Sequence, residues 1–317
     1  MHKSTLVDTP FFLVGSERSG TTLLRLMLDH HPRIAFNGES ELIVAQIADD
    51  GTYPKIERYR EWLRNDRIFQ GSRFSIDEGL DFVGLVNDFL NQKRSRDNKE
   101  IVGATVHIKF RKLRRIWPRA KYIYLYRDGR DVTDSVMRMG WAGNVYVAAD
   151  WWLEAEKEWE GLRDTLNDDD WIEIRYEDLV ANTQAEMERF CAFFGVEYSE
   201  KMFDYARNST YGAPDASLMY QWKTRMRKVD VQRLEEKLGD RLLRRGYALS
   251  GHPRISVPRL TRKCLYLHSR VNAYLFRIRR FGAVLTLQET LSRGLGLKQA
   301  HQRAMTRINR VINANLK

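Results

Sequence analysis

The stretch from Phe11 to Glu39 constrains the fold of this chain more than any other. An apolar run, Phe11 to Val14, precedes the polar loop Gly15-Ser16-Glu17-Arg18-Ser19-Gly20-Thr21-Thr22, and leucines then recur at helical spacing as far as Pro32. This order predicts a buried strand, a tight loop and a helix that ends before Pro32. Such a loop directs several backbone N–H groups at one point, and the helix N-terminus adds partial positive charge. We therefore expect an anion-binding site at this loop.

The loop resembles a nucleotide triphosphatase loop only in part. Gly15 and Gly20 are five residues apart and Thr22 supplies a hydroxyl, as that motif requires. Thr21, however, occupies the position of the motif's lysine, and the nearest cation is Arg18. The loop is thus expected to bind an anion other than a magnesium-bound triphosphate.

Further apolar segments alternate with helical patterns along residues 1–250. Strands are expected at 33–36, 101–107, 121–126 and 171–176, and helices at 41–48, 76–92, 108–117, 129–139, 151–166, 182–194 and 230–245. This alternation predicts an α/β fold in which helices cover both faces of a parallel sheet. The binding site of such a fold lies at the carboxyl ends of the strands.

A second candidate anion site follows the strand at 121–126. Arg127 stands at the end of that strand, and Ser135 lies eight residues later, about two turns into the next helix. The forked donors of Arg127 and the hydroxyl of Ser135 suit a phosphate group. Arg130 is instead expected to pair with neighbouring aspartates on a solvated face.

These motifs resemble the sulfotransferase superfamily, in particular its bacterial branch and the tyrosylprotein sulfotransferases. The resemblance covers residues 11 to about 248 and rests on Arg-Ser-Gly-Thr-Thr-Leu-Leu with a later His-Pro, on Arg-Asp-Gly-Arg-Asp-Val at 127–132, and on Arg-Tyr-Glu-Asp-Leu at 175–179. It implies a P-loop-like sulfotransferase fold and the co-substrate 3′-phosphoadenosine 5′-phosphosulfate (PAPS), without a metal ion. It also implies a place for each motif on the nucleotide, with Arg127 and Ser135 at the 3′-phosphate. The residues implied at the 5′-phosphosulfate are Arg18, Ser19, Gly20, Thr21 and Thr22.

Transfer of a sulfuryl group needs a base for the acceptor hydroxyl and positive charge on the leaving phosphate. Arg18 and its loop are expected to supply the charge. Glu39, twenty-one residues after Arg18, matches the catalytic glutamate of the tyrosylprotein branch, and His107 matches the catalytic histidine of cytosolic sulfotransferases. Families that use the glutamate usually keep a lysine near the position of His107, but here lysines occur only downstream, at Lys109 and Lys112. The choice of base stays open, with Glu39 preferred.

Two other segments are weaker candidates for the site. Trp222 and Lys223 match a pair that closes over the nucleotide in bacterial relatives, with the indole on adenine and the lysine at a phosphate, although core packing is an equal alternative for the tryptophan. The segment at 139–144 is a candidate lining of the acceptor pocket.

The positive charge of the chain is concentrated at its end. The net charge is +11, but residues 251–317 hold fourteen Lys and Arg and a single acid, Glu289, while the remaining residues hold 39 basic and 41 acidic side chains. This distribution argues against a specific nucleic-acid binder. We therefore predict a sulfotransferase domain at 1–250, with a variable insertion at 49–100, and a basic amphipathic helical tail at 251–317, which is broken near Gly282. The tail is expected to pack on the body, form a homodimer or contact an anionic membrane.

The predicted function is transfer of a sulfuryl group from PAPS to an acceptor hydroxyl. The acceptor is left open between peptide tyrosine, a glycan, a lipid headgroup and a small molecule. The alternatives are an ATP-dependent phosphotransferase with a modified loop and a membrane-associated nucleotide-binding protein without turnover. Two distant cysteines and the short N-terminal apolar run predict a cytoplasmic protein. The alternative is a protein attached to the cytoplasmic face of a membrane.

Overall fold

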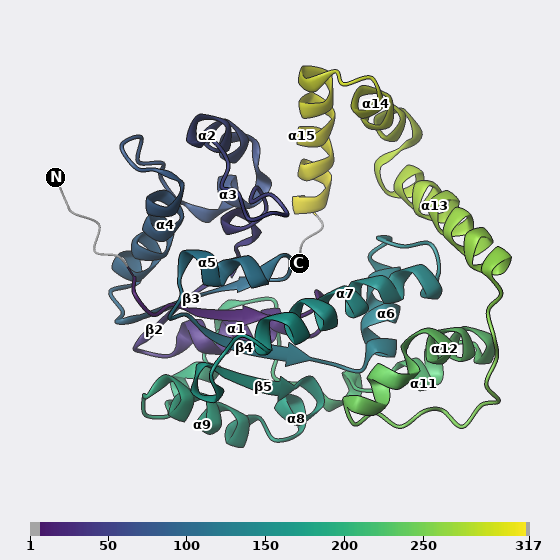
Figure 1. Ribbon diagram of the computed structural model, residues 1–317, viewed down its shortest axis with the longest axis horizontal. Helices are drawn as coiled ribbons and strands as arrows, with labels where there is room; N and C mark the ends of the chain where they lie inside the picture. Colours follow the sequence, from purple (N-terminus) through teal and green to yellow (C-terminus); the bar gives the residue numbers. More distant parts are fainter. Residues whose placement is uncertain (1–6, 315–317) are drawn as a thin grey trace. The chain divides into compact units, whose positions relative to one another are not determined.

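The computed structural model describes residues 7–314 and contains one five-stranded parallel sheet (Figure 1). The strand order is β2-β3-β1-β4-β5, so β1 lies at the centre between β3 and β4 and β5 lies at an edge. The strands are β1 (Phe11–Val14), β2 (Ile34–Glu39), β3 (Ile101–Val106), β4 (Lys121–Tyr126) and β5 (Trp171–Arg175). All five predicted strands are present, and the α/β fold with a parallel sheet flanked by helices is confirmed.

Alternate residues of the central strand enter two separate hydrophobic cores, which is why β1 is apolar throughout. Phe12 and Val14 join the core that contains α4 (Phe82–Asp97), whereas Phe11 and Leu13 join the core that contains α1 (Thr21–His30) and α9 (Thr183–Phe194). Burial on both faces holds the strands in one register, because a shift by one residue would exchange the two cores. Because all five strands are parallel, their carboxyl ends meet along one edge of the sheet.

The described residues form two compact units. One is the described part of Met1–Arg127 together with Leu153–Met219, and it contains the whole sheet; the other is Asp128–Trp152 together with the described part of Tyr220–Lys317. The predicted boundary at residue 250 stays a prediction, and residues 1–6 and 315–317 of the two predicted domains lie outside the described part. The remaining helices of the first unit are α2 (Ile56–Asn65), α3 (Arg67–Ser72), α5 (Leu113–Ile116), α8 (Tyr176–Ala181) and α10 (Tyr205–Asn208).

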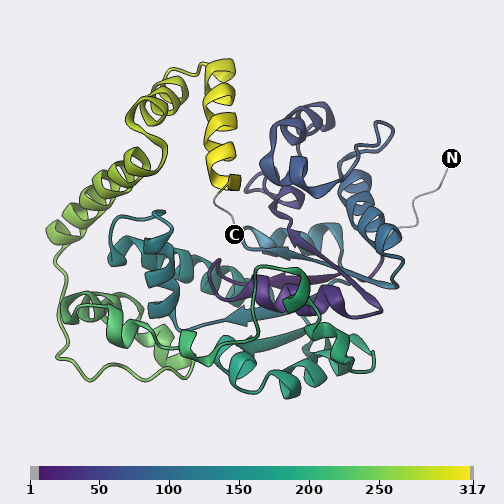
Figure 2. The ribbon, with the colours of Figure 1, turned by 180° about the vertical axis from the view of Figure 1, so that it is seen from behind.

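The second unit is helical. Its helices are α6 (Gly129–Arg138), α11 (Trp222–Arg225), α12 (Lys228–Arg244), α13 (Arg259–Phe281), α14 (Ala283–Gly294) and α15 (Lys298–Ala314), and α7 (Val145–Arg163) begins in this unit and ends in the first. Figure 2 shows α13 to α15 from behind, in green to yellow. The helical tail and its break at Gly282 are confirmed. None of the helices within residues 7–314 has both the length and the apolar composition needed to cross a membrane.

Three predicted helices differ from the observed ones. The segment 41–48 contains only a short 3-10 helix, Glu41–Ile43, and the basic segment 108–117 contains a 3-10 turn and the four-residue α5. The helix predicted from residue 76 begins at Phe82, because the carboxylate of Asp81 accepts a hydrogen bond from Gly84 N and caps the helix there. Apolar spacing alone did not locate these ends.

The segment at 139–144, a candidate lining of the acceptor pocket, contacts the tail helix α13. Gly143 N donates a hydrogen bond of 2.8 Å to Ser269 Oγ, and Asn144 Nδ2 donates one of 2.6 Å to Leu265 O. A Cβ atom on Gly143 would lie 2.3 Å from Ser269 O, so only glycine permits this close approach. The segment therefore anchors the first part of the tail within the second unit.

Candidate functional site

The loop after β1 has the backbone geometry of an anion site. Arg18 (φ 71°) and Gly20 (φ 97°) adopt left-handed conformations, a strained state for the arginine and an easy one for the glycine. This alternation turns the chain sharply into α1, whose first turn holds no acidic residue and, within residues 7–314, has no side-chain cap at its N-terminus. The first N–H groups of the helix are therefore donors for a ligand rather than for a cap.

A buried side chain in the same loop also fits an anion. The Ser19 side chain is fully buried, and its Oγ has no hydrogen-bond partner among the described residues. A buried hydroxyl without a partner is costly, and such groups in native structures usually have a functional reason. The loop therefore offers hydrogen-bond donors for an anion.

Tyr176 connects this loop with Arg127 inside the first unit. A Cβ atom on Gly20 would lie 2.4 Å from the Tyr176 ring, so the ring packs directly against the glycine backbone. The Arg127 guanidinium lies over the same ring, 4.3 Å from its centroid. One aromatic side chain thus contacts both predicted anion sites.

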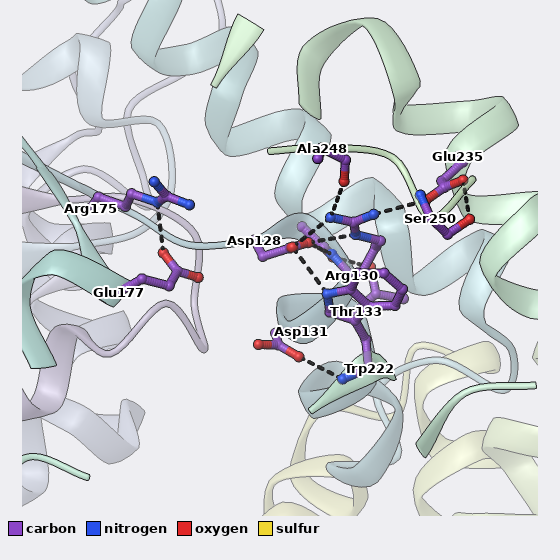
Figure 3. Close-up of polar contacts among 11 residues, drawn as sticks. Asp128, Arg130, Asp131, Thr133, Arg175, Glu177, Trp222, Glu235, Ala248 and Ser250 are labelled. Carbon is purple, nitrogen blue, oxygen red and sulfur yellow. Dashed lines mark hydrogen bonds and ion pairs between the residues drawn. The ribbon is translucent and has the colours of Figure 1, made fainter. Parts of the chain in front are cut away.

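The Arg-Tyr-Glu-Asp-Leu segment at 175–179 ends β5 and begins α8. α9 begins at Thr183 after Asn182, and within the described chain it has no side-chain cap. The pair between Arg175 Nε and Glu177 Oε2, 3.4 Å apart, lies at the turn that carries Tyr176 (Figure 3). The contacts of the Tyr176 ring with Gly20 and Arg127 could not be recognised from the sequence.

His107 lies in a chain of hydrogen bonds at the end of β3. Its Nε2 is 3.0 Å from Thr21 Oγ1, and its Nδ1 is 2.8 Å from Glu41 Oε1, which also accepts a bond of 3.1 Å from His107 N. Burial disfavours the charged imidazole, but the hydrogen bond to Glu41 and the nearby carboxylates of Glu41, Glu17 and Glu39 outweigh it and raise the pKa of His107. With both ring nitrogens protonated, the imidazolium donates to Glu41 and to Thr21.

Glu39 lies close to this histidine because of an irregularity in β2. The register shifts between Asn37 and Glu39, which places Glu39 opposite Thr105, two residues before His107. Glu39 is exposed, unlike Glu41, and so an incoming acceptor can reach it. Glu41 was not predicted from the sequence; it is only two residues further along but lies after the strand has ended.

Glu17, in the loop after β1, adds a third carboxyl group near His107, beside those of Glu41 and Glu39. Burial raises its pKa, as do the charges of Glu41 and Glu39, while His107 and Arg18 act in the opposite direction. A raised pKa favours the neutral carboxylic acid, which repels an anion less than a carboxylate does.

Ser135 and Arg127 belong to different units. Ser135 lies in α6, about two turns from its start as predicted, and its side chain is buried. Arg127 ends β4 in the first unit. Their joint binding of one phosphate stays a prediction.

Trp222 lies in a buried polar cluster of the second unit (Figure 3). Its backbone N donates to Asp131 Oδ1 at 2.9 Å and its Nε1 to Asp128 Oδ2 at 3.1 Å, while the Arg130 guanidinium lies 3.8 Å from the centroid of its ring. One side of the indole is thus occupied by an arginine and the residue as a whole is buried, so adenine could stack on it only if its other side became exposed. Lys223 Nζ lies 4.9 Å from the centroid of the Tyr220 ring.

Arg130 pairs with an aspartate as predicted, but the solvated face predicted for this pair is wrong. Arg130 is buried and makes ion pairs of 2.7 Å with Asp128 and with Glu235 from α12. The hydrogen bonds to Asp128 and Glu235 outweigh the cost of burial, and the pKa of Arg130 is raised. This cluster ties α6 to α12 and to the chain after it, where Ala248 O accepts a further bond.

The sequence matches one family model over most of the sheet-bearing region. Residues 10–200 match the model described as "Sulfotransferase family". Among the curated relatives, protein-tyrosine sulfotransferase A of Caenorhabditis elegans is 24% identical over 223 residues, covering 62% of this chain and 53% of that protein. Protein-tyrosine sulfotransferase 2 of Gallus gallus is 24% identical over 204 residues, with coverages of 61% and 53%. The chain thus spans about half the length of these relatives.

Two solved structures share the fold at low sequence identity. The sulfotransferase domain from the curacin biosynthetic pathway aligns with a TM-score of 0.54 and 19% identity, covering 77% of this chain and all of that domain. The sulfotransferase domain of the Synechococcus PCC 7002 olefin synthase aligns with a TM-score of 0.50 and 21% identity, with coverages of 73% and 96%. At this sequence identity, the similarity to the two structures shows a shared fold alone.

Proposed function

The chain belongs to the sulfotransferase family, and from this premise we propose that it transfers a sulfuryl group from PAPS to an acceptor hydroxyl. The observation that carries the proposal is the position of Tyr176, in contact with both Gly20 and Arg127. Two anion sites that share one aromatic ring can bind the two ends of one nucleotide. An ATP-binding loop needs no second phosphate site of this kind, but PAPS carries a phosphate at each end.

The residues that would hold PAPS follow from the two anion sites. The loop residues Arg18 to Thr22 would hold its 5′ end through backbone N–H groups, the Ser19 hydroxyl and the Arg18 charge. Arg127 and Ser135 would hold its 3′-phosphate, and Trp222 with Lys223 would close over the nucleotide. Bound PAPS would supply the activated sulfuryl group. Within residues 7–314, no three His, Cys, Asp or Glu side chains gather in a way that could hold a metal ion.

We assign proton transfer to Glu39 and positive charge to His107. Glu39 is the exposed carboxylate at the site and can accept the proton of an acceptor hydroxyl. His107 is buried, but Glu41 and the other carboxylates raise its pKa, which favours the imidazolium near neutral pH. Its charge can stabilise negative charge on the transferring group, the role that a lysine has in glutamate-dependent relatives.

Glu41→Gln is expected to distinguish this assignment from the reverse one. Loss of the carboxylate should lower the pKa of His107, because the hydrogen bond and the charge of Glu41 are what raise it. If His107 acts as a cation, activity will be lost on the alkaline side at a lower pH than in the wild type. If His107 is the base, activity will instead extend to a more acidic pH. A pH profile of radiolabelled PAPS turnover measures this, and a shift of the acidic limb would contradict our assignment.

Selective binding of adenosine 3′,5′-bisphosphate (PAP) is the direct test of the nucleotide. A charge-assisted hydrogen bond contributes about 1.5–3 kcal/mol, so PAP should bind about 10- to 150-fold more tightly than AMP in calorimetry. Preferential binding of ADP with magnesium would favour the phosphotransferase alternative. PAP binding without any transfer to an acceptor would favour the nucleotide-binding protein without turnover.

The acceptor class is proposed on chemical grounds. A hydroxyl of a peptide tyrosine, a glycan, a lipid headgroup or a small molecule suits the exposed Glu39. The curated relatives are called protein-tyrosine sulfotransferases, which makes a tyrosine peptide the first acceptor to try. Incubation with radiolabelled PAPS and a cell extract would identify the labelled acceptor.

Both cysteines, Cys191 and Cys264, are free thiols, which supports the proposal of a reducing, cytoplasmic compartment.

A further inference from the structure

The tail helix α14 has its polar side chains inside and its apolar side chains outside. Thr286, Glu289 and Ser292 are buried, and α14 packs against α15, where Ala304 and Ile308 are buried in turn. The exposed apolar side chains on the opposite face are Val284, Leu287 and Leu291 of α14 and Leu295 directly after it, with 50–71% of their surface accessible, and Gln288 is exposed among them. Amphipathic helices of proteins in water bury their apolar side chains and expose their polar ones. The exposed apolar face of α14 is therefore suited to an apolar environment.

α13 also carries apolar side chains on its outer face, although Phe276 packs inward against Gly140. Its inner face makes polar contacts, since Ser269 Oγ accepts a hydrogen bond from Gly143 N and Asn272 Nδ2 donates one to Gly143 O. Its outer face carries Leu260, Leu267, Val271 and Leu275, which are 43–73% exposed and follow one another at spacings of seven, four and four residues. These four exposed apolar side chains therefore face away from the segment 139–144, on which the helix packs.

The charges around these two stripes are almost all positive. Glu289, the single acid of residues 251–317, is buried and forms an ion pair of 2.6 Å with Arg277. Lys263, Arg270 and Arg279 are exposed on α13 beside its apolar stripe. The tail thus presents apolar side chains and cations together, without an accessible carboxylate among its described residues.

We propose that the outward faces of α13 and α14 dock on an anionic lipid bilayer. An amphipathic helix with leucines on one side and Lys and Arg beside them lies in the plane of a membrane interface, with its apolar face among the acyl chains. Anionic headgroups are attracted to the nearby cations. A second copy of the chain is a poorer occupant, because each tail carries fourteen basic residues and one acid, and a homodimer through these faces would bring like charges together.

Co-sedimentation of the full chain with lipid vesicles tests this docking. The protein is expected to bind vesicles of phosphatidylcholine with phosphatidylserine, to bind pure phosphatidylcholine vesicles far more weakly, and to be released by salt. Leu287→Ser together with Leu291→Ser should lower the association constant about tenfold or more. Lys263→Gln and Arg270→Gln should each lower it about fivefold.

Leu243→Ser is the matched control, since Leu243 is an equally exposed leucine on α12, outside the tail. It should bind the mixed vesicles as the wild type does. Equal binding to both kinds of vesicle, no binding to the mixed vesicles, or binding that the leucine pair leaves unchanged would overturn the proposal. So would a dimer in light scattering that Leu287→Ser with Leu291→Ser dissolves, because the occupant would then be a second copy.

Discussion

Replacing Glu39 by Gln will lower the rate of sulfuryl transfer about 10²- to 10⁴-fold, the usual contribution of a positioned general base. The amide keeps the size of the side chain but cannot accept the proton of the acceptor hydroxyl. Because Glu39 is exposed, the substitution should leave the fold intact. The measurement is transfer from radiolabelled PAPS to a tyrosine-containing peptide or a simple phenol, with PAP affinity determined in parallel.

Glu61→Gln, at an exposed position on α2, is the control and should transfer at the wild-type rate. Full turnover in Glu39→Gln together with loss in His107→Gln would give the role of base to the histidine. PAP binding separates this result from misfolding, since a misfolded His107→Gln protein would lose its affinity for the nucleotide as well. A loss of PAP affinity in Glu39→Gln equal to its loss of rate would count against a role in the chemical step.

Arg127→Ala is expected to abolish the preference for PAP over AMP. The 3′-phosphate is the only difference between the two nucleotides, so PAP affinity should fall about 10- to 150-fold, or ~1.5–3 kcal/mol, while AMP affinity stays constant. Arg127→Lys keeps the charge but not the forked donors, and should recover only part of the preference. Calorimetric titration with both nucleotides measures these changes.

Arg189→Ala removes an arginine that pairs with Glu186 on α9 and serves as the matched control. It should leave both affinities unchanged. If Arg127→Ala weakens PAP and AMP by the same factor, the arginine acts through Tyr176 on the shape of the loop rather than on the 3′-phosphate. That result would remove Arg127 from the proposed 3′-phosphate site.

Local sequence was sufficient for the strands and for the position of the loop between β1 and α1. The apolar run before Gly15 and the helical spacing after Thr21 depend on neighbours within a few residues, and β1 and α1 lie where this pattern predicts. Parallel strands then bring their carboxyl ends to one edge, so the placement of Glu39, His107 and Arg127 at that edge followed from the order of the strands alone.

Helix ends and exposure were predicted less well. α4 begins at Phe82, six residues after the predicted start, because the single cap at Asp81 outweighs apolar spacing. Arginine is usually a surface residue, but the hydrogen bonds to Asp128 and Glu235 make the burial of Arg130 possible. The apolar stripe of α13 was visible in the sequence, but its direction was not.

The sequence by itself determined the α/β sheet, the loop and the amphipathic tail, because these depend on patterns that repeat along the chain. Only the tertiary structure decided which side chains act together. Glu41 and His107 are 66 residues apart, and Tyr176 contacts residues from two distant loops. Such contacts depend on how the elements pack, since packing brings together residues that no spacing relates. The same holds for the outward leucines of α14, whose environment is set by the helix that covers the opposite face.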